Sequence, residues 1–122
     1  MTGPGPSTPG PQERLAERIR AVLAGREVDH AVQREKRMFG GLCFLVDEQL
    51  VVSAGRDGDL LVRVDPADGD EHAQRGARPA TMGAARRPMG AGWLTVPADR
   101  LTDPDELAHW VDVGIAGRRS GQ

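Results

Sequence analysis

The segment Arg37-Met38-Phe39-Gly40-Gly41-Leu42-Cys43-Phe44-Leu45-Val46 contains both phenylalanines of the chain, its single cysteine and its only pair of adjacent glycines. Every residue from Leu42 to Val46 is apolar, which is typical of a short strand buried on both faces. Gly40 and Gly41 stand where this strand begins, and glycine suits a positive φ or the close approach of another chain. We therefore expect this segment to organise the fold through packing and turning, without a reactive group.

The size and composition of the chain indicate one small globular domain. It has 122 residues, of which 39% are hydrophobic and 28% charged, and its formal net charge is −2. This mixture disfavours general disorder, and no apolar run approaches the roughly 18 residues that a membrane span needs. The N-terminus lacks the basic start and apolar centre of an export signal, so we expect a cytoplasmic protein without a membrane partner. A single cysteine excludes an internal disulfide.

The ends of the chain differ in character from its centre. Residues 1–11 are rich in glycine, proline, serine and threonine, which predicts a disordered leader. From Gln12 an amphipathic helix is predicted, with Gly25 at its end. Its apolar stripe consists of Leu15, Ile19, Val22 and Leu23. We assign residues 12–117 to the domain and residues 118–122 to a frayed tail.

The centre of the chain predicts a run of antiparallel strands. Strands are expected over residues 28–37, 42–46, 50–54, 60–64, 79–82 and 93–96. The link Asp47-Glu48-Gln49 makes a hairpin of the second and third of these strands, and residues 55–59 form the next turn. Residues 83–92 are rich in glycine and arginine, which predicts a loop.

Two further helices have recognisable starts. Asp65-Pro66 predicts an N-cap and a first-turn proline for a short helix that reaches about Arg75. Asp103-Pro104-Asp105-Glu106 predicts a reciprocal capping box for a last helix. Its apolar stripe consists of Leu107, Trp110, Val111 and Ile115.

This order of elements predicts a two-layer α+β domain, in which helices pack on one face of an antiparallel sheet. Strands joined by tight links pair antiparallel, and only the first and last helices have a convincing apolar face. We expect Trp93 and Trp110 to anchor the core.

The polar residues do not form a recognisable catalytic set. His30, His72 and His109 lie far apart in sequence, so no metal site and no cofactor are predicted, and His109 is expected on a solvated helix face. Cys43 lies among apolar residues and is expected to be buried and inert. The best candidates for an anion-binding or acidic-partner surface are Arg75, Arg78, Arg86 and Arg87, against the alternative that they are solvated loop residues.

Several of these segments together resemble the N-terminal domain of the TfoX/Sxy family. The resemblance runs from about Leu15 to Ala116. It is carried by Arg37-Met38-Phe39-Gly40-Gly41, by the strand that ends in Asp65, by Arg87-Pro88-Met89 before Gly92-Trp93, and by the helix start Asp103-Pro104-Asp105-Glu106-Leu107. It implies a fold like that of type III secretion chaperones. Full-length TfoX proteins regulate bacterial competence and carry a second, C-terminal domain, and the family offers no catalytic residues to transfer. The turn Asp47-Glu48 departs from the Asp-Gly expected of the family.

The leading hypothesis from the sequence is a non-enzymatic interaction or regulatory module of the TfoX N-terminal type. It would act through an unidentified protein partner, with self-association as a homodimer as one mode of contact. The alternative is a weak nucleic-acid-binding protein that uses the arginine-rich loop. A third hypothesis, an uncharacterised enzyme, requires a pocket that contains a titratable group of shifted pKa.

Overall fold

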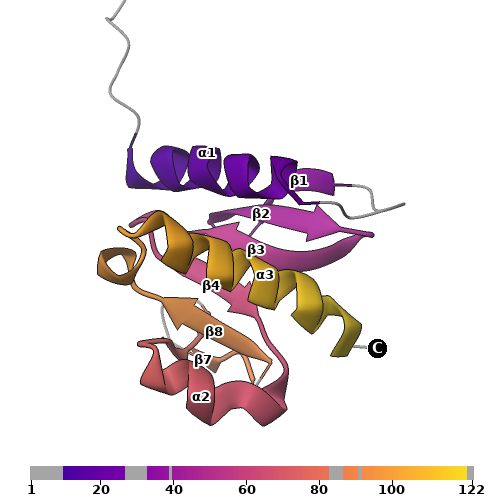
Figure 1. The fold of residues 1–122 in the computed structure, drawn as a ribbon, viewed down its shortest axis with the longest axis vertical. Helices are drawn as coiled ribbons and strands as arrows, with labels where there is room; N and C mark the ends of the chain where they lie inside the picture. Colours follow the sequence, from indigo (N-terminus) through magenta and orange to yellow (C-terminus); the bar gives the residue numbers. More distant parts are fainter. Residues whose placement is uncertain (1–9, 27–32, 39, 83–86, 91, 121–122) are drawn as a thin grey trace, which may run out of the picture.

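The apolar segment at the centre of the sequence forms an inner strand of a six-stranded antiparallel sheet (Figure 1). The computed structural model describes residues 10–26, 33–38, 40–82, 87–90 and 92–120. The sheet has the order β1-β2-β3-β4-β8-β5. Its strands are β1 (Gln33–Met38), β2 (Gly41–Val46), β3 (Gln49–Ala54), β4 (Leu60–Arg63), β8 (Trp93–Val96) and β5 (Arg78–Pro79). A separate two-stranded hairpin pairs β6 (Thr81–Met82) with β7 (Arg87–Pro88).

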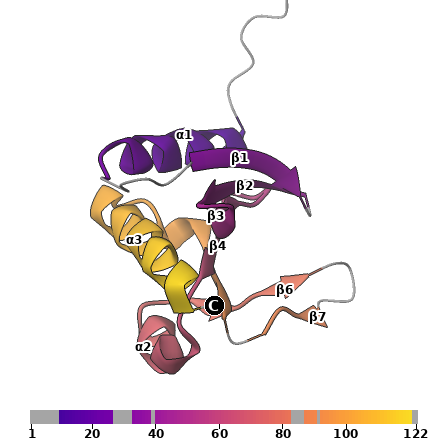
Figure 2. The same cartoon turned by 90° about the vertical axis from the view of Figure 1, so that its right-hand side faces the viewer.

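The helices lie on one face of this sheet. The two long helices, α1 (Pro11–Ala24) and α3 (Pro104–Ser120), contact each other, and both contact the central strands. The 3-10 turn η1 (Pro66–Asp68) and α2 (Gly69–Gln74) follow β4, and η2 (Ala98–Arg100) follows β8. Figure 2 shows α3 and the β6–β7 hairpin on opposite sides of the strands. The predicted two-layer α+β fold with helices on one face is therefore confirmed.

The hydrophobic core fills the layer between the helices and the sheet. Trp110 and Ile19 are completely buried there and face Phe44 of β2 and its neighbours. The strand residues of the core alternate with residues that face the other side, as a pleated strand requires. Their cross-strand rows are Phe44, Val52, Val62 and Leu94, and Leu42, Ala54, Leu60 and Val96.

Two glycines let α3 lie directly against the backbone of the sheet. A Cβ atom added to Gly114 would lie 2.6 Å from the carbonyl oxygen of Val51, and one added to Gly117 would lie 2.6 Å from that of Arg63. Val51 is the extra residue of a β-bulge, because Phe44 pairs with Val52 while Leu45 pairs with Leu50. The absence of a side chain at Gly114 and at Gly117 therefore sets the distance between α3 and the sheet.

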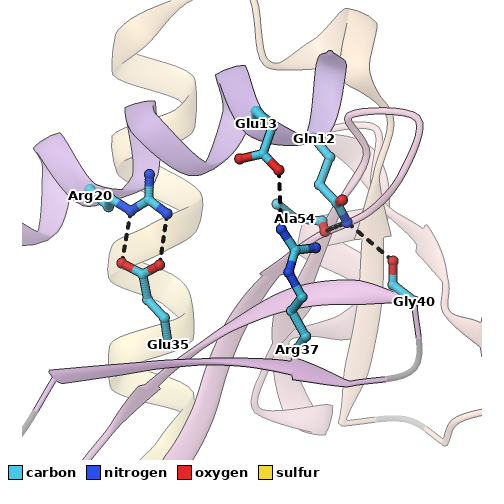
Figure 3. Close-up of polar contacts among 7 residues, drawn as sticks. All are labelled: Gln12, Glu13, Arg20, Glu35, Arg37, Gly40 and Ala54. Atoms are coloured by element: carbon cyan, nitrogen blue, oxygen red, sulfur yellow. Dashed lines mark hydrogen bonds and ion pairs between the residues drawn. The ribbon is translucent and has the colours of Figure 1, made fainter. Parts of the chain in front are cut away.

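Polar contacts attach α1 to the edge of the sheet, because β1 has charged residues where its neighbours have apolar ones (Figure 3). Arg20 forms two hydrogen bonds with Glu35, at 2.7 and 2.8 Å, and Arg37 pairs with Glu13 at 3.2 Å. The hydrogen bonds that Arg20 donates to Glu35 lower the pKa of the Glu35 carboxyl group. These pairs are solvent-exposed, so we assign them to the positioning of α1 and not to a large gain in stability.

The N-terminus of α1 and the start of α3 are fixed by hydrogen bonds. The Gln12 side-chain amide donates to the carbonyl oxygens of Gly40 and Ala54, at 3.1 and 2.9 Å (Figure 3). Asp103 caps α3, because its Oδ1 accepts from the backbone N–H of Asp105 at 2.9 Å. Glu106, which we predicted to complete the capping box, forms an ion pair with Arg75.

Several predicted boundaries were wrong. The hairpin between β2 and β3 turns on two residues, Asp47 and Glu48, both with positive φ, and not on the three predicted. The predicted strand over residues 28–37 is observed from Gln33, and residues 28–32 lie outside the described residues. The predicted loop over residues 83–92 contains β7, which pairs with β6.

The last helix is longer than predicted, and one residue predicted for the core lies outside it. The helix α3 continues to Ser120, beyond the fraying expected from Gly117, because Gly117 packs on Arg63 and is buried. Residues 1–9 of the predicted leader lie outside the described residues, and its last residue, Pro11, begins α1. Trp93 is half-buried and lies outside the core, with the Arg63 guanidinium 5.3 Å from its ring centre. None of the helices in the described part of the chain has the length and apolarity for a bilayer crossing.

We predict that Gly114→Ala destabilises the protein by about 1–3 kcal/mol, because the new methyl group overlaps the backbone of Val51 and α3 must move. Chemical denaturation of purified protein measures this change. The matched control is Gly69→Ala in α2, where an added Cβ meets no atom within 4 Å. The control should have unchanged or slightly higher stability, since alanine favours helix. Equal stability of Gly114→Ala and wild type would contradict the proposed role of the glycine.

Candidate functional site

A groove of about 520 Å³ lies on the sheet face opposite α1 and α3. Strands β1 to β4 and β8 contribute its floor, and the segments around β6 and β7 contribute one wall. Its lining residues are Met38, Gly40, Gly41, Cys43, Ser53, Gly55, Arg56, Asp59, Leu61, Thr81, Met89 and Thr95. The groove exists because the helices cover only one face, while the hairpin rises from the other (Figure 2).

A row of paired residues crosses the sheet through this groove. The register places Cys43 opposite Ser53, Ser53 opposite Leu61, and Leu61 opposite Thr95. Lys36 pairs with Cys43 at one edge of the sheet, and Arg78 pairs with Thr95 at the other. Directly paired residues point to the same face. This cross-sheet row, Lys36-Cys43-Ser53-Leu61-Thr95-Arg78, therefore has small or apolar groups in the middle and a cation at each end.

Cys43 is part of the groove floor, and its thiol is buried. Its side chain is 1% exposed, and its Sγ lies 3.4 Å from Ser53 Oγ and 3.9 Å from the Met38 carbonyl oxygen. Gly41 makes room for this pair, because a Cβ at that position would lie 2.5 Å from Ser53 Oγ. The prediction of a buried thiol is confirmed, and no imidazole bonds to it among the described residues.

One end of the groove carries a guanidinium group. Arg56 is exposed in the turn between β3 and β4, and its side chain lies beside Gly40 of the β1–β2 turn. Asp59 is the one carboxylate among the lining residues, and its Oδ1 accepts the Ala98 backbone N–H at 2.9 Å. Within the described part of the chain, no ion pair engages Arg56.

The family-like motif at residues 37–41 is divided between the two faces of the sheet. Arg37 points to the helix side and pairs with Glu13, while Met38, Gly40 and Gly41 line the groove. Phe39 lies outside the described residues. We predicted a structural role for this motif and missed the groove. The alternation of β1 could have placed Met38 and Arg37 on opposite faces, but the hairpin wall leaves no signal in the sequence.

The structure does not gather the four candidate arginines into one described cluster. Arg75 pairs with Glu106 of α3 at 3.0 Å, on the helix side. Arg78 is exposed at the edge of the sheet, at the end of the cross-sheet row. Arg87 begins β7, and Arg86 lies outside the described residues. The sequence did not indicate Arg56, Arg63 and Lys36, because strand register assigns Lys36 and Arg63 to the open face and the fold of the β3–β4 turn places Arg56 beside the groove.

A second polar cluster lies between α2 and α3. The rings of His72 and His109 lie 5.3 and 5.1 Å from the ring of Trp110, measured between centroids. His72 is buried, and three buried nitrogens of this cluster have no hydrogen-bond partner among the described residues: His72 Nδ1, His109 Nε2 and Trp110 Nε1. Burial lowers the pKa of His109, and the nearby Arg75 charge lowers it further. The prediction of a solvated His109 was therefore wrong.

The described residues offer no assembled reaction centre. No group of three or more histidines, cysteines, aspartates or glutamates among them is placed to hold a metal ion. The histidine cluster provides two imidazoles, fewer than the three or four ligands of a zinc site. The groove combines a buried thiol, hydroxyls, methionines and a guanidinium.

Comparison with known protein families gives a match over most of the chain. The sequence profile of the TfoX N-terminal domain matches residues 30–117. The matched region contains the whole sheet, the β6–β7 hairpin and most of α3. No curated protein sequence matches the chain.

We predict that the Cys43 thiol reacts with dithiobis-nitrobenzoate only when the protein unfolds. The native thiol should react at least about 1,000-fold more slowly than that of the chain in denaturant, since a domain of ordinary stability rarely opens its core. Absorbance of the released thiolate measures the rate. Rapid modification of the folded protein would show that the thiol is accessible and would reopen the question of an enzyme.

We predict that stability falls as the pH drops below the ordinary histidine value of about 6.5. The pKa of His109 is lowered in the folded state, so the unfolded chain binds more protons than the folded protein in this pH range. Acidification therefore shifts the equilibrium toward the unfolded chain. Urea denaturation between neutral and mildly acidic pH measures the slope. His109→Gln should reduce that slope, whereas parallel curves for the variant and wild type would contradict the assignment.

Proposed function

The chain belongs to the TfoX N-terminal domain family, and we propose that it is a non-enzymatic interaction module that contacts a protein partner through the groove on its open sheet face. In this proposal the module acts in the bacterial cytoplasm and has a regulatory role. The family supports the regulatory class, and the groove supports the place of contact. Self-association is the alternative mode of contact.

The observation that carries the proposal is the combination of a groove with an unreactive lining. The groove has about 520 Å³, which lies in the range of ligand and peptide sites. Its apolar side chains include Met38, Leu61 and Met89, and methionine adapts its shape to different partners. Because Met38, Gly40 and Gly41 of the family-like motif line this groove, part of the segment most typical of the family would also be part of the contact surface.

A second candidate function, nucleic acid binding, is favoured by the cations of the open face. Lys36 and Arg78 end the cross-sheet row, and Arg63 lies over the Trp93 ring on the same face. Single-stranded nucleic acids bind such faces through stacking on several aromatic rings. Among the described strands, Trp93 is the one aromatic residue on this face, and Arg63 already covers it. The groove therefore favours a protein partner.

We predict that Leu61→Glu abolishes partner binding without unfolding the protein. Leu61 is half-buried in the middle of the groove lining. A carboxylate at this position should disfavour the binding of an apolar side chain of the partner, but it does not lie in the hydrophobic core. Affinity purification from the native cytoplasm, with wild type and variant in parallel, measures the effect by quantitative mass spectrometry. The expected result is a protein that wild type enriches and the variant loses by tenfold or more, about 1.4 kcal/mol.

The matched control is Ala21→Glu, which adds the same charge at an exposed position of α1. This variant should retain the partner. Identical recovery with all three proteins, or recovery of nothing above background by wild type, would contradict the proposal. Sedimentation of wild type and Leu61→Glu tests self-association, since a homodimer through the groove would dissociate in the variant.

A further inference from the structure

We propose that the groove binds an acidic peptide segment of a partner protein, with one apolar side chain in the groove and carboxylates on the cations around it. This inference deepens the proposed function and rests on it.

The open face is basic, although the chain as a whole has a net charge of −2. Lys36 and Arg78 are exposed at the two ends of the cross-sheet row, and Arg56 is exposed at the turn end of the groove. Arg63 adds a fourth cation beside Leu61 along β4. None of these four cations takes part in an ion pair between described residues.

Two carboxylates at this face, Asp59 and Glu48, are already engaged. Asp59 accepts the Ala98 N–H, and Glu48 of the β2–β3 turn pairs with Arg34 at 2.8 Å. Several arginines elsewhere on the surface, among them Arg20, Arg26 and Arg37, have an acidic partner, although Arg14 of α1 has no ion pair among the described residues. The open face therefore has cations whose complement is missing from the described chain, and a partner with carboxylates would supply it.

The shape of the groove selects a segment that also contains an apolar side chain. Leu61 is half-buried on the floor, and Met38 and Met89 are half-buried at its sides. Glycine and threonine form much of the remaining lining, so the space between these side chains suits one aliphatic group. Burial of that group would give affinity, while the cations at the rim would give orientation and a faster encounter.

A second copy of this chain does not supply this combination from its acidic segment. Residues 65–71 contain four carboxylates, Asp65, Asp68, Asp70 and Glu71, but no apolar side chain larger than proline or alanine. The partner segment is therefore assigned to a different protein.

The test uses the full chain and fluorescein-labelled peptides of defined composition. The probe has five Asp-Leu repeats, and the two comparison peptides have Asn-Leu and Asp-Ser repeats. A ten-nucleotide oligothymidylate tests nucleic acid on the same surface. Fluorescence anisotropy at low and physiological salt measures each affinity. We expect the Asp-Leu probe to bind at least tenfold more tightly than the other three ligands.

Two variants locate the site. Arg56→Glu should weaken the Asp-Leu probe about tenfold or more, which corresponds to about 1.4 kcal/mol. The control Arg14→Glu reverses an exposed arginine of α1, on the other face, and should leave the affinity unchanged. Leu61→Ser should weaken the binding of the Asp-Leu probe, but it should leave any residual binding of the Asp-Ser peptide unchanged. Circular dichroism verifies that each variant is folded.

The following results would overturn the inference. Equal affinities for the Asn-Leu and Asp-Leu peptides would show that the groove does not recognise negative charge. Equal losses of affinity in Arg56→Glu and Arg14→Glu would show non-specific electrostatic attraction. Tighter, Arg56-dependent binding of oligothymidylate would assign the face to nucleic acid. If no peptide binds while Leu61→Glu still loses a native partner, the partner chemistry is wrong and the proposed interaction function stands.

Discussion

The contact between α3 and the backbones of β3 and β4 determines which face of the sheet is left open. Gly114 and Gly117 present no side chains there, so the helix approaches the Val51 and Arg63 carbonyl groups directly. This close approach brings Trp110 into the core, where it is completely buried. With α1 beside α3, the helices cover the same side of the sheet (Figures 1 and 2). Both faces of β2 are buried, but only one of them lies under helices.

The other face has a different construction, and the groove follows from it. Cys43 and Ser53 are buried outside the core cluster and form part of the groove floor. An antiparallel sheet with one uncovered face normally presents polar groups to water. Here that face carries methionines, Leu61 and Trp93, all half-buried, between cations, and we assign this mixed surface to the proposed partner.

The histidine cluster shows that the helix layer also has a polar side. His72 and His109 pack against Trp110, and three of their buried nitrogens have no partner in the described chain. Buried polar groups without hydrogen bonds cost free energy, and burial lowers the pKa of His109, so acid opposes the packing of this ring in the folded protein. The Arg75–Glu106 ion pair lies beside this cluster and joins the same two parts of the fold.

Hydrophobic periodicity and capping residues act locally, so the fold class and most of the elements could be predicted from the sequence. The apolar run before Asp47 predicted β2, Asp103 predicted the start of α3, and the motif at residues 37–41 indicated the family. Only the tertiary structure decided where the surfaces lie. The register of paired strands brings Lys36, Leu61 and Arg78 into one row, although they are far apart in the chain. In the same way, His109 is half-buried because α2 packs beside it, a contact that no local pattern records.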